Sequence, residues 1–223
     1  MKSHGRRLNL GVMRPKLEPI VAEFRQVVDG IYGTFLDARD GFGRVRESVV
    51  KLEEEHKEHI EGIRKERPEL SDLTYGGSEF SYGRLVRAGS KPRYRHLHQL
   101  PTEKIKQRNE EGGANFRLIG NVCLVTLYQF WEDNYRELLA DVFEVNKNQI
   151  QVQLFGDIAK YRHAILHNRG VATSDVEKCT ILRWHKKDEQ ILLDREKFEE
   201  VIDAIFAFLD NVEKEPEQFL KRA

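Results

Sequence analysis

The sequence predicts a mainly all-α fold, a helical bundle with a long irregular insertion and a short β-hairpin before its last helix. Apolar residues recur at helical spacing in several segments, as they do on helices with one buried stripe. Only six prolines are present, and the sixteen glycines cluster in a few places. The charged share of 33% suits helices with one solvated face. We therefore expect residues 1–223 to form one helical domain.

The N-terminal part predicts a helix pair over residues 15–66. Residues 15–38 place apolar side chains at helical spacing, and residues 42–66 repeat the pattern more sparsely among glutamates and lysines. Pro68 closes the second helix. A helix pair would bury two such narrow stripes against each other.

Residues 69–114 predict a long irregular insertion, because glycines and prolines punctuate them and no hydrophobic period holds. Residues 84–108 contain eight cationic side chains and a single acidic one, Glu103, which gives a local charge of +7. The whole chain is neutral, with 37 basic and 37 acidic residues, so only such local segregation points to a nucleic-acid partner. Arginine beside tyrosine suits phosphate contacts and base stacking on single-stranded RNA, and a solvated charged loop is the plainer alternative. The candidate RNA-binding residues are Arg84, Arg87, Arg93, Tyr94 and Arg95.

Residues 115–212 predict the core of the domain. Residues 115–145 form the strongest helix, with an apolar face broad enough to pack on two sides, and residues 148–168 form another. We expect a short β-hairpin over residues 179–193, followed by a final helix that Asp194 caps.

The remaining composition excludes several classes of protein. Cys123 and Cys179 are flanked by apolar residues and form no CxxC pair, so we expect small core residues in a reducing compartment. The longest apolar runs are too short to span a bilayer, and residues 1–15 lack the apolar run of a secretory signal. We therefore expect a cytoplasmic protein without membrane contact.

A short motif at the end of the 148–168 helix carries the candidate chemistry. Its residues are, in order, Arg162, His163, Ala164, Ile165, Leu166, His167, Asn168, Arg169 and Gly170. Gly170 is also a helix stop, since glycine readily takes the left-handed conformation there. Together with the aromatic and acidic residues 127–132, this pattern resembles the signature of HEPN ribonucleases. The resemblance covers residues 115–212, about half of the chain.

The resemblance implies an endoribonuclease that cleaves RNA without a metal. In that scheme a ribose 2′-OH attacks the adjacent phosphate and leaves a 2′,3′-cyclic phosphate and a 5′-OH. His167 would act as the base, because histidine titrates near neutral pH, and Arg162 would clamp the phosphate with its planar guanidinium. The supporting residues would be His163, Asn168 and Glu132, with Arg169 binding RNA. HEPN ribonucleases commonly act as toxins or antiviral effectors, so an antitoxin or regulatory protein is an implied partner.

The spacing of the motif leaves alternatives open. On a regular helix a step of five residues turns by ~140°, so Arg162 and His167 converge only if the helix end distorts or two copies face each other. The resemblance implies the second, a homodimer with the motif at its interface. One alternative is a catalytically inactive HEPN-like module for RNA binding, nucleotide binding or dimerisation, and another is a plain surface pair at a helix end. His163 and His167 share a helix face, but no third ligand is obvious, so we expect no metal and no cofactor.

Overall fold

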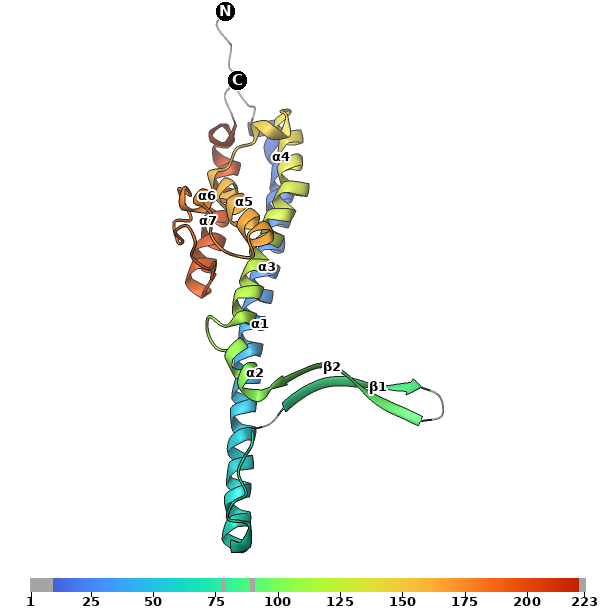
Figure 1. Cartoon of the computed structure of the whole chain (residues 1–223). Coiled ribbons are helices and arrows are strands. Elements are labelled where there is room, and N and C mark those ends of the chain that lie inside the picture. The colour runs from blue at the N-terminus through green and yellow to red at the C-terminus, as the bar shows by residue number, and fades with distance from the viewer. Residues whose placement is uncertain (1–9, 78, 89–90, 221–223) are drawn as a thin grey trace, which may run out of the picture. The chain divides into compact units, whose positions relative to one another are not determined.

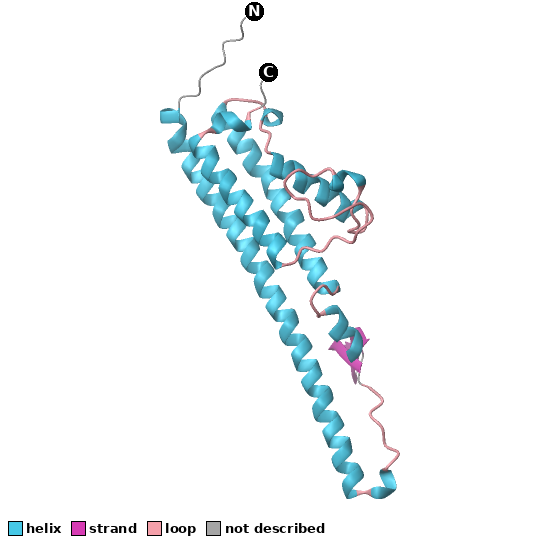
Figure 2. Ribbon diagram, turned by 90° about the vertical axis from the view of Figure 1, so that its left-hand side faces the viewer, coloured by secondary structure: helices cyan, strands magenta, loops and turns pink. Residues whose placement is uncertain are grey.

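The computed structural model describes residues 10–77, 79–88 and 91–220, most of which are helical (Figures 1 and 2). The chain divides into two compact units. The first, termed the bundle unit, comprises Met1–Asp37 and Arg117–Ala223, and the second, termed the ribbon unit, comprises Ala38–Phe116. The expected helical character is confirmed.

A single helix, α1, runs from Leu10 to Glu66 and contributes residues to both units. The prediction of a helix pair over 15–66 is therefore wrong. The interval between the two expected helices stays helical because its glycines cost the helix only about 1 kcal/mol each. No proline lies between Pro19 and Pro68 to break the helix.

The bundle unit packs the first part of α1 with the helices that follow the ribbon unit (Figure 2). The helix bounds are Ala114–Phe130 for α3, Arg136–Phe143 for α4, Gln153–His167 for α5, Ser174–Glu177 for α6 and Arg195–Lys214 for α7. Short 3-10 turns cover Lys147–Gln149 and Pro216–Phe219. The helices predicted over 115–145 and 148–168 are thus confirmed. So is the cap of the last helix, because the Asp194 carboxylate accepts the backbone N–H of Lys197 at 2.9 Å.

A π-helical turn, Trp131–Tyr135, joins α3 to α4 and lies at the centre of the core. Trp131 stacks on Phe155 of α5, with ring centroids 4.0 Å apart and planes 5° from parallel. Tyr135 stacks on Phe24 of α1, with centroids 4.2 Å apart. All four rings are almost fully buried. The turn therefore joins α1 and α5 to the α3–α4 segment through aromatic contacts.

The segment between α6 and α7 contains no strand, so the β-hairpin expected over residues 179–193 is wrong (Figure 2). Its backbone N–H groups find a different acceptor, because the buried carboxylate of Asp157 on α5 accepts from Thr180, Ile181 and Leu182 at 2.8, 2.7 and 3.3 Å. The alternating apolar residues that suggested strands belong instead to the core of the bundle unit, as Leu182, Ile191 and Leu193.

The ribbon unit contains an antiparallel hairpin where an irregular insertion was expected over residues 69–114 (Figure 1). A 3-10 turn, Pro68–Leu70, precedes it, β1 spans Glu79–Ala88, β2 spans Lys91–Pro101, and α2 follows at Thr102–Arg108. Gly83, one of the glycines on which the prediction of a loop rested, lies within β1. A Cβ atom on Gly83 would lie 2.5 Å from Cε1 of Tyr94 and 2.6 Å from the carbonyl oxygen of Arg95, so the glycine makes room for the tyrosine ring on the opposite strand.

Glu53 of α1 anchors α2 within the ribbon unit. Its carboxylate accepts from Oγ1 of Thr102 at 2.5 Å and from Nζ of Lys106 at 2.8 Å. The hydrogen bonds from Lys106 and Thr102 hold the pKa of Glu53 below its usual value. Because Lys106 also pairs with Glu103 at 2.7 Å, this part of the basic segment is locally neutralised.

Candidate active site

Helix α5 carries the motif and ends as its sequence predicts. The backbone N–H groups of Asn168 and Gly170 both donate to the carbonyl of Ala164, at 2.9 and 3.2 Å. Gly170 has a φ of 73°, and Arg169 before it is also left-handed, with a φ of 56°. The side chain of Asn168 donates from Nδ2 to the carbonyl of Val171 at 2.8 Å. Asn168, predicted as a supporting residue, thus stabilises the chain just after the helix.

Arg162 lies half-buried between α5 and α3. Its guanidinium carbon is 5.6 Å from the ring centroid of Tyr128, a cation–π contact between the two helices. The Nε–H of Arg162 is buried and has no hydrogen-bond acceptor within the described part of the chain. Because Nε is closed to solvent, an anion could reach this guanidinium only at its Nη groups.

His163 and His167 are both exposed and lie one helical turn apart on α5. Their ring centroids are 4.8 Å apart. Asp175 of α6 lies close enough to His163 for the imidazole to contribute to the lowered pKa of this carboxyl, after the larger effect of the Lys178 hydrogen bond. Two imidazoles therefore stand beside each other in solvent, next to a helix end that favours positive charge.

Within one chain the structure separates Arg162 from His167. The arginine turns toward Tyr128 on α3, whereas His167 is the last residue of α5 and lies in solvent. The expected divergence of ~140° along a regular helix therefore holds, because the helix remains regular up to His167.

Exposed apolar side chains lie on the two helices beside the motif. Leu166 of α5 is 50% exposed and Val122 of α3 is 48% exposed. The two helices are neighbours along this stretch, since Arg162 contacts Tyr128 and a Cβ on Gly170 would lie 3.4 Å from Nδ2 of Asn121. This surface, which we call the α3–α5 face, is suited to burial against another molecule.

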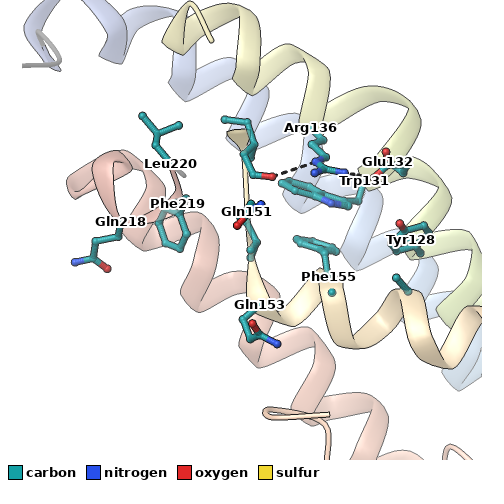
Figure 3. A pocket seen from close by; sticks show the side chains of 14 residues that line it. Tyr128, Trp131, Glu132, Arg136, Gln151, Gln153, Phe155, Gln218, Phe219 and Leu220 are labelled. Carbon is teal, nitrogen blue, oxygen red and sulfur yellow. Dashed lines mark hydrogen bonds and ion pairs between the residues drawn. The ribbon is translucent and has the colours of Figure 1, made fainter. Parts of the chain in front are cut away.

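Glu132, the remaining supporting residue, does not contact Arg162. It lies in the π-helical turn, where its carboxylate pairs with Nη1 of Arg136 at 2.8 Å (Figure 3). The same carboxylate also pairs with Nζ of Lys147 at 3.2 Å. Nε of Arg136 donates in turn to the carbonyl of Ile150 at 3.2 Å. The glutamate therefore belongs to an ion-pair network rather than to the motif.

A cleft of about 440 Å³ opens beside this network (Figure 3). Its wall includes Tyr128 of α3 and Gly156 and Ala159 of α5. Tyr128 also carries the guanidinium of Arg162 against its ring, and burial, followed by the charge of Glu132, raises the pKa of its hydroxyl. The cleft thus adjoins the motif through Tyr128, and a π-helical turn beside a cleft is typical of functional sites.

Sequence reasoning missed Asp157, which organises the segment that packs on α5. Besides its three backbone donors, the carboxylate pairs with Nζ of Lys160 at 3.1 Å. Burial acts to raise the pKa of Asp157, but the hydrogen bonds from Ile181, Lys160 and neighbouring backbone groups outweigh it and lower the pKa. The sequence contained one indication of this role, because Asp157 falls on the buried side of the predicted helix. A carboxylate is tolerated there only when hydrogen bonds or ion pairs satisfy it.

The candidate RNA-binding residues of the hairpin fall on opposite faces. Arg84 pairs with Arg95 across the strands and Val86 pairs with Arg93, which places the three arginines on one face. Tyr94 pairs with Leu85 and Arg87 pairs with Pro92, which places both on the other face. Tyr94 therefore lies on the face opposite Arg93 and Arg95, its neighbours in the sequence. Arg169, the remaining candidate, lies exposed in the bundle unit.

No group of three or more histidine, cysteine, aspartate or glutamate residues suited to a metal ion occurs among the described residues. None of the helices in the described ranges is long and apolar enough to cross a membrane. Comparisons with models of protein families, with curated proteins and with solved structures found no match to this chain.

Proposed function

We propose that the chain is a metal-independent endoribonuclease of the HEPN type that acts as a homodimer, in the cytoplasm. The observation that carries this proposal is the half-buried Arg162, whose Nε–H lacks an acceptor within the described chain, on the same helix as two exposed imidazoles. A fixed cation and a proton-transferring pair are the two elements that this reaction requires.

The reaction needs a base, an acid and a phosphate clamp. His167 removes the proton from a ribose 2′-OH, and the oxygen then attacks the adjacent phosphorus. The bond from phosphorus to the 5′-oxygen breaks, which leaves a 2′,3′-cyclic phosphate. His163, whose ring centroid is 4.8 Å from that of His167, donates a proton to the leaving 5′-oxygen. Arg162 binds the phosphate oxygens as their charge increases in the transition state.

The proposed homodimer brings the phosphate-binding arginine and the base to one site. Arg162 and His167 diverge on one α5, so a second copy related by a two-fold axis brings the arginine of one chain toward the histidine of the other. The α3–α5 face provides apolar surface for this contact through Leu118, Val122 and Leu166.

A second candidate is a catalytically inactive module that binds RNA or a nucleotide, or only dimerises. The contact between Arg162 and the ring of Tyr128 favours it, because that contact already gives the guanidinium a packing role inside the chain.

The test is cleavage of end-labelled RNA in excess EDTA, with analysis of the product ends. We expect cleavage to persist and to give 2′,3′-cyclic phosphates. His167→Ala and Arg162→Ala should each lower the rate by about 10²–10⁴-fold, whereas His59→Ala and Arg44→Ala, at exposed positions of α1, serve as matched controls. RNA binding without cleavage would favour the inactive module. Cleavage that EDTA abolishes would contradict the metal-independent mechanism.

A further inference from the structure

The hairpin of the ribbon unit is a two-stranded ribbon with little support of its own. Apart from pairing with each other, β1 and β2 contact α2, where β2 ends. Most side chains along the ribbon are exposed, including Leu85 at 72% and Tyr94 at 49%. An isolated two-stranded ribbon is only marginally stable in water.

One face of the ribbon is strongly cationic. Arg84 and Arg95 are direct cross-strand partners, and Arg93 lies on the same face opposite Val86. Like charges directly opposite each other destabilise a sheet, so this pairing opposes folding of the ribbon by itself. Among the described residues, none of the three arginine side chains forms an ion pair or hydrogen bond. The face, which we call the arginine face, therefore presents three unpaired guanidinium groups.

The cations of α2, at the end of the basic segment, have partners within the ribbon unit. Lys106 is paired with Glu53 and Glu103. Nη1 of Arg108 lies 2.6 Å from Nε2 of His98. The positive charge of the segment is thus concentrated on the ribbon, and its arrangement suits a polyanion with repeated acceptors.

The rings of the ribbon do not suit a single strand with stacked bases. Tyr94 lies on the face opposite the three arginines, with its ring over Gly83. Tyr82 lies on the arginine face, but its ring packs against Phe80 and His98, with centroids 4.9 and 6.1 Å away. Binding of single-stranded nucleic acid normally combines cations with free rings for stacking, and the arginine face offers mainly cations.

The width of the ribbon distinguishes between kinds of duplex. Paired strands lie ~4.8 Å apart, so a two-stranded ribbon is ~10 Å wide. The major groove of B-form DNA is ~12 Å wide and admits such a ribbon, whereas its minor groove is only ~6 Å wide. The major groove of duplex RNA is deep and too narrow for side chains to enter. Arginines that face the floor of the B-form groove meet the N7 and O6 acceptors of guanine and, at the margins, the phosphates.

We propose that the arginine face of the ribbon binds double-stranded DNA in the major groove. This proposal is independent of RNA cleavage, because its residues belong to the ribbon unit and the motif belongs to the bundle unit. Loss of cleavage in His167→Ala should leave DNA binding unchanged, so each proposal can fail without the other.

The experiment measures fluorescence anisotropy of the full chain with a labelled 20-base-pair DNA duplex, the same sequence as duplex RNA, and each single strand. The matched pair of variants is Arg93→Ala on the arginine face and Arg87→Ala on the opposite face, which remove the same charge from exposed positions. We expect Arg93→Ala to weaken binding of duplex DNA by about tenfold or more and Arg87→Ala by less than about twofold. The triple variant Arg84→Ala, Arg93→Ala, Arg95→Ala should weaken it by on the order of 100-fold. The plot of the logarithm of the binding constant against the logarithm of the salt concentration should also change for the triple variant. Its slope should be shallower by about 0.9 for each removed arginine that contacts a phosphate rather than a base.

Duplex RNA or a single strand that binds as tightly as duplex DNA would overturn the proposal. So would equal effects of Arg93→Ala and Arg87→Ala, or no binding of any nucleic acid near physiological salt. Circular dichroism and the thermal unfolding midpoint of each variant should match the wild type, which excludes unfolding as the cause of weaker binding.

Discussion

The hydroxyl group of Tyr161 lies 3.2 Å from Nδ1 of His185, so the residue that precedes Arg162 is bonded to the segment between α6 and α7. The backbone N–H of Leu192 donates to Nε2 of His185 at 3.2 Å. Nδ1 therefore carries the proton of the neutral ring and donates to the tyrosine oxygen, while the Tyr161 hydroxyl donates to the carbonyl of Leu182 at 3.3 Å. Burial, followed by the charge of Lys197, lowers the pKa of His185.

The stability of the bundle unit should fall in mild acid because of His185. Below about pH 6.5 the unfolded chain protonates this histidine, whereas the folded chain resists protonation until its lower pKa is reached. The free energy of unfolding should therefore decrease from about pH 6.5 downward, by at most about 1.4 kcal/mol per pH unit for this one group. Urea denaturation between pH 7.5 and 5.5 measures it. His185→Asn should flatten the slope, and an unchanged slope would refute the assignment.

Removal of the Asp157 carboxylate should release the segment from α6 to α7. Asp157→Ala leaves three backbone N–H groups without their acceptor, so we expect a loss of on the order of 3 kcal/mol in the free energy of unfolding. The control is Asp175→Ala, whose exposed carboxylate pairs with Lys178 and contributes little. Chemical denaturation at pH 7 distinguishes the two variants. Equal losses would show that the three backbone contacts add nothing. Because the pKa of Asp157 is lowered, its stabilisation should persist at pH 5 and be lost only as the pH falls below about 4 toward the folded value.

A side chain at Gly83 should disrupt the ribbon. Gly83→Ala places a methyl group against the Tyr94 ring and the Arg95 carbonyl, and the backbone carbonyl cannot move without changing the strand pairing. We expect trypsin to cleave at the ribbon arginines faster by on the order of tenfold. Gly76→Ala is the control, because nothing lies within 4 Å of a Cβ at that position. Equal cleavage rates for the two variants would contradict the close contact of Tyr94 with Gly83.

The proposed homodimer predicts that a charge on the α3–α5 face will separate the subunits. Leu166→Asp introduces a carboxylate within the motif, directly before His167, at a position that the proposed dimer would bury. We expect a monomer by light scattering at micromolar concentration, and loss of RNA cleavage with it. Leu52→Asp, at a similarly exposed apolar position of α1, should change neither. A dimer that tolerates Leu166→Asp would place the interface elsewhere.

Local chemistry made the end of α5 predictable from the sequence. Gly170 stops the helix through its own conformational freedom, and Asp194 caps α7 with its own side chain, so neither depends on distant residues. The apolar periodicity of residues 115–145 was equally reliable, because it reports one broad buried face. Arg162, His163 and His167 also lie on α5, the helix predicted to carry them.

Distant partners explain what the sequence did not reveal. The residues expected as a hairpin bond instead to Asp157, more than twenty positions earlier, and no periodicity reports such a partner. The ribbon was missed because the glycines and prolines of residues 69–114 indicated a loop, although Gly83 and Pro92 lie within β1 and β2. The break expected in α1 was wrong because glycines alone do not end a helix when its stripe continues on both sides.

The π-helical turn at Trp131–Tyr135 determines which changes in length the segment from α3 to α4 tolerates. A π turn accommodates one residue more than the α-helix it interrupts, so it is equivalent to a single-residue insertion that the helix has absorbed without unfolding. If the same residues formed a regular α-helix, everything downstream would rotate by ~100°. The buried Phe143 would then turn toward solvent. Deletion of one residue in the turn should instead restore a regular helix and keep α4 in its present packing, so a one-residue gap there is compatible with the same core.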